Sequence, residues 1–252
     1  MKTILISNDD GIFGYGLKPL VEEVSKIARV LVVVPEKEQS AVSHKLTLRD
    51  PVRSRQISKN TFIMDGTPAD CVRYGIIRVG KRKIDLVISG VNYGSNLGID
   101  VFYSGTVGAA REGAFMGIPS IASSLVSRTG KNFQPAAAFT AKLAKKVLDT
   151  GKKDILLNVN IPDLPKSRLK GVKMTSLGNK IYDDTIHCKK DPYGLSYYWL
   201  KGNVIKSKNQ PGTDLHTVEN DMISITPLSI DGTNYEMLEK LNSQFSFRKI
   251  TL

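Results

Sequence analysis

The chain has 252 residues, of which 41% are hydrophobic, and Lys and Arg outnumber Asp and Glu by 36 to 24. This composition supports a sizeable core and argues against a disordered chain, and the net charge of +12 is spread too evenly to form a nucleic-acid-binding tail. Its two cysteines, Cys71 and Cys188, lie too far apart to suggest a zinc cluster, and no apolar run reaches membrane-spanning length. We therefore expect a protein of the reducing cytoplasm, with no membrane partner and no stable nucleic-acid partner.

The chain begins with a strand, a helix and a second strand. Residues 4–6 form a continuous apolar run typical of a strand buried on both faces, and apolar residues at helical spacing follow over 17–27. The β-branched run 30–34 then ends at Pro35. This βαβ unit predicts a parallel sheet covered by helices.

Further alternation extends this pattern as far as residue 165. Residues 52–57 and 61–64 predict a hairpin that leans out from the sheet. Thr67-Pro68-Ala69-Asp70 supplies an N-cap, a proline at the first helical position and an acid three residues after the cap, so a helix is expected to begin there. Other predicted elements are strands at 84–89, 118–124 and 155–159 and helices at 106–116 and 135–149. We expect residues 1–165 to form a Rossmann-like, three-layer αβα catalytic core with a mostly parallel sheet.

Residues 166–252 have a different pattern, in which aromatic and β-branched segments alternate with turn signals. Residues 197–200 and 204–205, joined by Lys201-Gly202-Asn203, predict a protruding β-hairpin with its turn at 201–203. Such a ribbon either pairs with a second subunit or packs back on its own core. A strand at 222–226 and a terminal helix at 235–241 complete a C-terminal extension of the same domain.

Polar residues cluster after the predicted strands, where open α/β sheets bind ligands. Because the carboxyl ends of parallel strands share one edge, these side chains are expected to converge on one crevice. They are Asp9, Asp10, Ser40, Ser43, His44, Asn92 and Asn96, together with the segment Ser104-Gly105-Thr106 at the start of a predicted helix.

The adjacent carboxylates of Asp9 and Asp10 repel each other in a cleft unless a cation or hydrogen-bond donors compensate. With the hydroxyl of Ser40 and the amide oxygen of Asn92 they offer an all-oxygen ligand set, suited to Mg²⁺, Mn²⁺ or Ca²⁺. The alternative is that both aspartates cap the turn that follows.

The segment Ser104-Gly105-Thr106 predicts an anion site, because a helix N-terminus binds phosphate through its free N–H groups and its dipole. Either hydroxyl could equally be a plain N-cap. An anion site opposite two carboxylates is reasonable when a metal bridges them. His44 could be an acid, a base or a substrate ligand, or simply a hydrogen-bonding loop residue.

These residues resemble the survival protein E (SurE) family of metal-dependent 5′/3′-nucleotidases. The matching segments are residues 4–11, 35–47, 66–72, 89–96 and 103–107, with weaker matches at 218–228, so the resemblance covers nearly the whole chain. It implies a divalent cation per subunit, Mg²⁺ or Mn²⁺, and a homodimer or homotetramer formed through the C-terminal extension. It also implies that Asp9, Asp10, Ser40 and Asn92 bind the metal and that Asn96, Ser104, Gly105 and Thr106 surround the phosphate.

The expected activity is hydrolysis of nucleoside 5′- and 3′-monophosphates, with short polyphosphate as a further candidate substrate. Asp9, Asp10 and Asn96 are the expected catalytic residues, and Ser43 and His44 are additional candidates for contact with substrate. Two alternatives remain. One is a dinucleotide-binding oxidoreductase, although Gly11, Gly14 and Gly16 have the wrong spacing. The other is a basic nucleic-acid-binding protein without catalysis.

Overall fold

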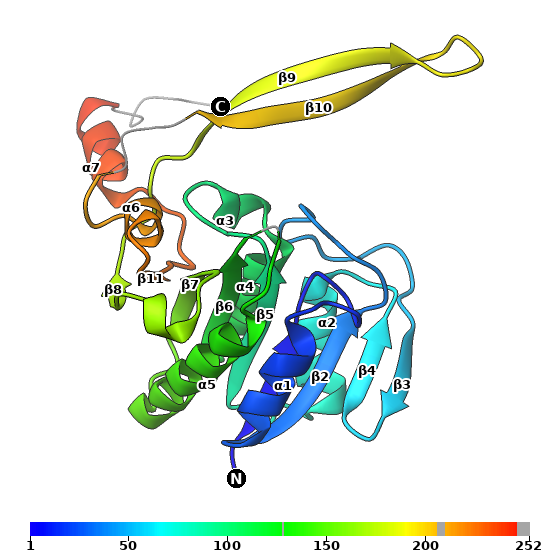
Figure 1. Ribbon diagram of the computed structural model, residues 1–252, viewed down its shortest axis with the longest axis vertical. Coiled ribbons are helices and arrows are strands. Elements are labelled where there is room, and N and C mark those ends of the chain that lie inside the picture. Colours follow the sequence, from blue (N-terminus) through cyan, green and yellow to red (C-terminus); the bar gives the residue numbers. More distant parts are fainter. Residues whose placement is uncertain (128, 206–209, 246–252) are drawn as a thin grey trace.

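A nine-stranded, mostly parallel sheet forms the centre of the computed structural model, which describes residues 1–127, 129–205 and 210–245 (Figure 1). Its strand order is β3-β4-β2-β1-β5-β6-β7-β11-β8. The strands are β1 (Thr3–Ser7), β2 (Arg29–Pro35), β3 (Ser54–Ser58), β4 (Thr61–Met64), β5 (Leu86–Tyr93), β6 (Ser120–Val126), β7 (Leu156–Pro162), β8 (Val172–Met174) and β11 (Ile223–Pro227). Strands β4, β2, β1, β5, β6 and β7 run parallel, whereas β11 is antiparallel to β7.

Helices cover both faces of this sheet, which confirms the three-layer prediction. Helices α1 (Leu17–Ser25) and α5 (Phe133–Thr150) pack side by side on one face (Figure 1). Helices α2 (Pro68–Tyr74) and α4 (Gly105–Phe115) pack side by side on the other face. The β1 residues Ile4, Leu5 and Ile6 are completely buried between these layers, as their uninterrupted apolar run predicted.

Local sequence signals account for the starts of two helices. Thr67 caps α2 by accepting a hydrogen bond from the Asp70 backbone, and the Asp70 carboxylate accepts one from the Thr67 backbone in return. In α4 the cap is Ser104, whose hydroxyl oxygen accepts from Val107 N–H at 3.1 Å. The helix therefore begins one residue before the predicted Thr106.

The hairpin predicted near residues 52–64 does not lean out from the sheet. Strand β4 pairs in parallel with β2, and β3 pairs antiparallel with β4 to form the sheet edge. The apolar side chains of β4 explain this difference, because Ile63 and Met64 become buried by joining the sheet.

The C-terminal hairpin protrudes as predicted, but its turn is elsewhere. Strand β9 (Ile181–Lys190) pairs antiparallel with β10 (Ser196–Ile205), so Gly202 lies inside a strand opposite Asp184. The turn falls at residues 191–195, where Gly194 has a φ of +83° that glycine adopts without strain. The prediction of a turn at 201–203 was wrong because tertiary pairing outweighed a Gly-Asn signal.

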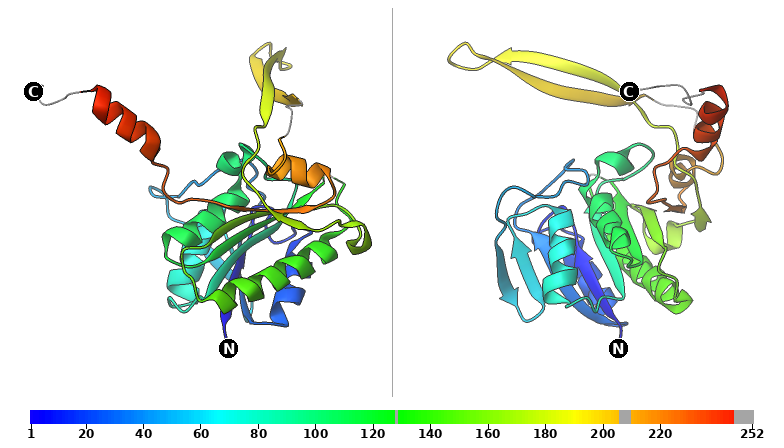
Figure 2. Two further views of the ribbon diagram at one scale, coloured as in Figure 1. Left: turned by 90° about the vertical axis from the view of Figure 1, so that its left-hand side faces the viewer. Right: turned by 180° about the vertical axis from the view of Figure 1, so that it is seen from behind.

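The hairpin and the terminal helix α7 (Tyr235–Gln244) both stand away from the sheet (Figure 2). Large apolar side chains of the hairpin are exposed, including Ile186, Trp199 and Leu200. Five short elements were not predicted from the sequence: η1 (Gly75–Val79), α3 (Asp100–Tyr103), η2 (Lys166–Arg168), β8 and α6 (Asp214–Glu219). Parts of the predicted extension, residues 206–209 and 246–252, lie outside the described residues. None of the described helices has the length and apolar character needed to cross a bilayer.

Candidate active site

A cavity of about 850 Å³ opens at the carboxyl edge of the parallel sheet. Five of the predicted site residues line it, namely Asp9, Ser40, Asn92, Asn96 and Ser104. In order, they come from the loop after β1, the loop after β2, β5, the loop after β5 and the start of α4. The predicted convergence at this edge holds for these five residues. The other predicted residues, which are Asp10, Ser43, His44, Gly105 and Thr106, are not among those that line the cavity.

Asp9 lies at the end of β1 and is only 6% exposed. The Thr106 hydroxyl donates to Asp9 Oδ1 at 2.5 Å, which ties the carboxylate to the first turn of α4. This approach requires glycine at position 105, because a Cβ there would lie 2.9 Å from Asp9 Cβ and 3.0 Å from Val42 Cγ1. Burial raises the pKa of Asp9, and hydrogen bonds from Thr106 oppose that increase.

Asp10 lies beside the cavity, where its Oδ2 accepts from Tyr93 N–H at 3.2 Å. Burial, and then the charge of Asp9, raise the pKa of Asp10 to about 7. The turn after β1 is instead capped by Asn8, which exchanges two hydrogen bonds with Gly11. This contact removes the reason to regard the two aspartates as turn caps.

The loop after β2 adds Ser40 and an acid that the sequence reasoning missed. The Gln39 backbone donates to Asp9 O at 2.8 Å, which holds the loop against the end of β1. Ser40 donates to Glu38 Oε1 at 2.6 Å, and Glu38 also lines the cavity. The charge of Glu38 further raises the pKa values of Asp9 and Asp10. Its place just after a buried strand was a signal that could have identified it.

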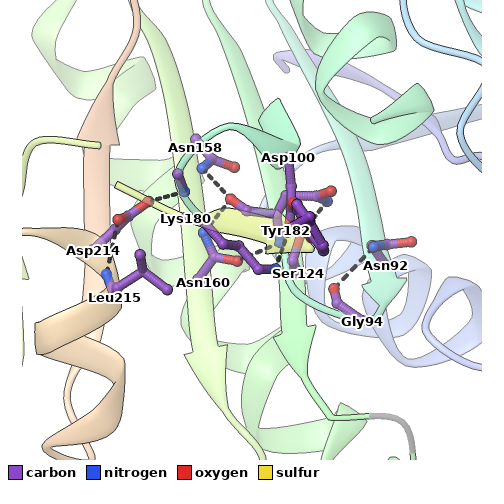
Figure 3. A network of polar contacts seen from close by, with 12 residues as sticks. Asn92, Gly94, Asp100, Ser124, Asn158, Asn160, Lys180, Tyr182, Asp214 and Leu215 are labelled. Carbon is purple, nitrogen blue, oxygen red and sulfur yellow. Dashed lines mark hydrogen bonds and ion pairs between the residues drawn. The ribbon is translucent and has the colours of Figure 1, made fainter. Parts of the chain in front are cut away.

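Asn92 belongs to β5, whereas the sequence had indicated that it lies in the loop after that strand. The β5–β6 register shifts between Ser89 and Asn92, so the strand is irregular just before this side chain. Asn92 Nδ2 donates to Gly94 O at 2.9 Å (Figure 3). With its nitrogen engaged in this bond, the amide oxygen is the atom suited to bind a cation.

Asn96 is held by a polar network that includes Ser124, Asn158 and Asn160, the three partners labelled in Figure 3. Asn160 binds its backbone in both directions, accepting from Asn96 N–H at 2.8 Å and donating to Asn96 O at 3.0 Å. Asn158 donates to the same carbonyl at 2.7 Å, and Asn96 Nδ2 donates to Ser124 Oγ at 2.8 Å. These positioning residues were missed, although two asparagines in the apolar β7 run were a visible irregularity.

Asp214 links this loop to the C-terminal part of the chain. Its buried carboxylate accepts from Gly98 N–H at 2.9 Å and from Gly178 N–H at 2.7 Å. The segment after Gly178 carries Lys180 and Tyr182, which line the cavity together with Asp100. None of these three lining residues was predicted.

Ser43 and His44 do not line the cavity. Ser43 Oγ donates to Phe102 O at 2.5 Å. His44 Nε2 lies 2.9 Å from Glu112 Oε2, and its ring packs at a tilt against Phe115. These contacts fasten the loop that carries Ser40 to α3 and α4, which differs from the substrate contact expected from the sequence.

The donor set determines which metal the site suits. The described residues contain no group of three or more His, Cys, Asp or Glu side chains able to hold a metal ion. The candidate ligands are instead two carboxylates, Asp9 and Asp10, with the neutral oxygens of Ser40 and Asn92. An all-oxygen set of this kind fits a hard divalent cation.

The fold and this cavity define an α/β protein with an oxygen-rich ligand site at the carboxyl edge of its sheet. The sequence model of the family described as "Survival protein SurE" matches residues 4–184. A protein named 5′-nucleotidase SurE from Citrifermentans bemidjiense is 49% identical over 242 residues, covering 95% of this chain and 98% of that protein. One of the same name from Moorella thermoacetica is 42% identical over 250 residues, covering 97% of this chain and 96% of that protein.

Solved structures give the same result. The crystal structure of the SurE protein from Aquifex aeolicus matches with a TM-score of 0.86 and 41% identity, covering 96% of this chain and 99% of that chain. The chain therefore belongs to the SurE family, as the resemblance in its motifs had indicated. Membership in this family leaves the oxidoreductase and nucleic-acid-binding alternatives without support.

Proposed function

We propose that this protein is a divalent-metal-dependent phosphomonoesterase that hydrolyses nucleoside 5′- and 3′-monophosphates to nucleoside and phosphate. The observation that carries the proposal is the contact between Asp9 and Thr106 at the start of α4. It places a candidate metal ligand directly against a helix N-terminus, the part of a helix that binds phosphate. Relatives named 5′-nucleotidase SurE, which match nearly the full chain, support the substrate class.

In this proposal Asp9, Asp10, Ser40 and Asn92 hold one Mg²⁺ or Mn²⁺ ion per subunit. The cation supplies positive charge that offsets both carboxylates and the phosphate, and it makes water more acidic. The N-terminus of α4 is suited to stabilise the phosphate oxygens through its dipole and through those first-turn N–H groups that Ser104 and Asp9 do not engage. The Asn96 amide lines the cavity and donates one hydrogen to Ser124, and in this proposal it donates its second hydrogen to the same phosphate group.

The reaction needs a water oxygen to bond to phosphorus while the ester P–O bond breaks. One of the carboxylates, Asp9 or Asp10, orients this water and accepts its proton, and the nucleoside oxygen leaves with a proton from solvent. The pKa of Asp10, raised to about 7, is consistent with proton transfer near neutral pH, and burial shifts the pKa of Asp9 in the same direction.

Metal removal and replacement of Asp9 test this function together. We expect chelator-treated protein to release no phosphate from AMP and to recover activity with Mg²⁺ or Mn²⁺. Asp9→Asn should lower the restored rate about 100-fold or more, whereas exposed Asp149→Asn should leave it unchanged. Phosphate release that persists in chelator, or an Asp9→Asn protein with the native rate, would contradict the proposal.

We also propose that the C-terminal extension forms a homodimer or homotetramer. The exposed apolar side chains of the hairpin, such as Trp199 and Leu200, support this assignment because they gain burial in an interface. Light scattering should give a mass of two or four chains, which falls in a Trp199→Ser, Leu200→Ser variant. A native mass of one chain would exclude the proposal.

A location in the reducing cytoplasm is our further proposal, supported by two free cysteines, buried Cys71 and exposed Cys188. Cell fractionation tests it, and recovery of the protein in any other compartment would refute it.

A further inference from the structure

One side of the cavity is lined by three residues to which the proposed chemistry gives no role. Asp100 comes from α3, Lys180 directly precedes β9, and Tyr182 is the second residue of β9 (Figure 3). The Lys180 ammonium forms an ion pair with Asp100 Oδ2, and the Tyr182 hydroxyl donates to Asp100 Oδ1 at 2.5 Å. The side chains of Asp100 and Lys180 are 16% and 11% exposed, so the pair is largely removed from solvent but still reaches the cavity.

This arrangement keeps a carboxylate charged and fixed without filling its acceptor capacity. An ionised carboxylate offers about four acceptor positions on its two oxygens. Among the described residues, Lys180 and Tyr182 each engage a different oxygen of Asp100. Each oxygen therefore keeps a position for a further donor, and the Lys180 charge prevents Asp100 from repelling a nearby phosphate.

Two neighbouring hydroxyls are the donors that fit such a carboxylate, and ribose presents them at its 2′ and 3′ carbons. Acids bind ribose hydroxyls in this way in other α/β nucleotide-binding proteins. The backbone also places Asp100 near the phosphate end of the cavity, because Ser104 N–H donates to Asp100 O at 3.0 Å across the one turn of α3.

We propose that Asp100 binds the 2′- and 3′-hydroxyls of the substrate ribose and that Lys180 and Tyr182 are positioning residues that hold its carboxylate. This inference rests on the proposed nucleotidase function. It predicts that the enzyme prefers ribonucleoside 5′-monophosphates to 2′-deoxy substrates and to 3′-monophosphates. Ribonucleoside 5′-monophosphates present both hydroxyls, whereas a 2′-deoxy substrate lacks one and a 3′-monophosphate has one esterified.

The test compares three substrates with Mg²⁺ present: AMP, 2′-deoxy-AMP and p-nitrophenyl phosphate, which has no sugar. We expect the native enzyme to have a kcat/KM about tenfold higher for AMP than for 2′-deoxy-AMP, the range of one hydrogen bond to a charged group. Asp100→Asn should remove this difference by lowering kcat/KM for AMP, and Tyr182→Phe should reduce the difference. Both variants should hydrolyse p-nitrophenyl phosphate at the native rate. Exposed Asp184→Asn on β9 is the matched control and should keep the difference.

Two results would overturn the proposal. An unchanged ratio of AMP to 2′-deoxy-AMP in Asp100→Asn would show that Asp100 does not contact the ribose. An equal fall for p-nitrophenyl phosphate in both variants would show that the cluster only supports the fold. Tyr182→Phe, which removes a single hydroxyl, decides the question if Asp100→Asn does not fold.

A separate binding measurement distinguishes failure of this inference from failure of the nucleotidase function. If the native protein releases phosphate from none of the three substrates, calorimetry with adenosine and 2′-deoxyadenosine replaces the rate assay. A tenfold tighter Kd for adenosine that is lost in Asp100→Asn would support the ribose site. Equal Kd values for both nucleosides in the native protein would overturn it.

Discussion

Replacing Asp10 by Asn in the metal-free protein isolates the energetic effect of placing two carboxylates side by side. Burial and the charge of Asp9 raise the pKa of Asp10 from its ordinary value of 3.8 to about 7. Asparagine keeps the shape of the side chain and its hydrogen bond from Tyr93 N–H but cannot ionise. We expect Asp10→Asn to stabilise the metal-free protein at neutral and alkaline pH, while abolishing or greatly reducing activity.

The direction of this stability change follows from the number of protons bound by the folded and unfolded states. Between pH 4 and pH 7 the folded state keeps the Asp10 proton and the unfolded chain has lost it, so the free energy of unfolding falls as pH rises. The slope is about 1.4 kcal/mol per pH unit for one proton, and it flattens above about pH 7. The native metal-free protein thus loses on the order of 4 kcal/mol across this window, and Asp10→Asn avoids this loss.

Urea unfolding of chelator-treated protein at intervals from pH 4.5 to pH 8 measures this effect. The native protein should show the falling slope, and Asp10→Asn should show a slope smaller by about one proton. Exposed Asp149→Asn on α5 is the control and should follow the native curve. Added Mg²⁺ should stabilise the native protein most at high pH, because it binds the ionised carboxylates. Parallel pH curves for native protein and Asp10→Asn would refute the reasoning.

Three further substitutions test the architecture around this pair. Gly105→Ala should lower kcat at least tenfold without unfolding the protein, because its Cβ would displace Asp9, and native phosphate release would disprove that close approach. Thr67→Ala should lower the free energy of unfolding in urea by about 1–2 kcal/mol and leave kcat unchanged, because it removes the cap of a helix outside the cavity. A variant of native stability would show that this cap does not stabilise the protein. Asn160→Ala should raise KM or lower kcat about tenfold, because both backbone groups of Asn96 lose a partner, and unaltered kinetics would show that Asn158 alone positions that loop.

The sequence by itself determined the features that depend on local pattern. The buried run at residues 4–6 predicted β1, and the Thr67 to Asp70 spacing predicted the start of α2. Asp9, just after β1, identified one wall of the cavity, because the carboxyl ends of parallel strands share one edge.

Only the tertiary structure decided the contacts between residues far apart in the chain. Asn160 meets Asn96 across 64 positions, and Asp214 meets Gly98 across 116. Such bonds leave no periodic signal, since a buried amide or carboxylate selects its partner by position in space and not by spacing along the chain. The pairing of Lys180 with Asp100, and with it the second wall of the cavity, arises only when the segment entering β9 crosses the carboxyl edge of the sheet.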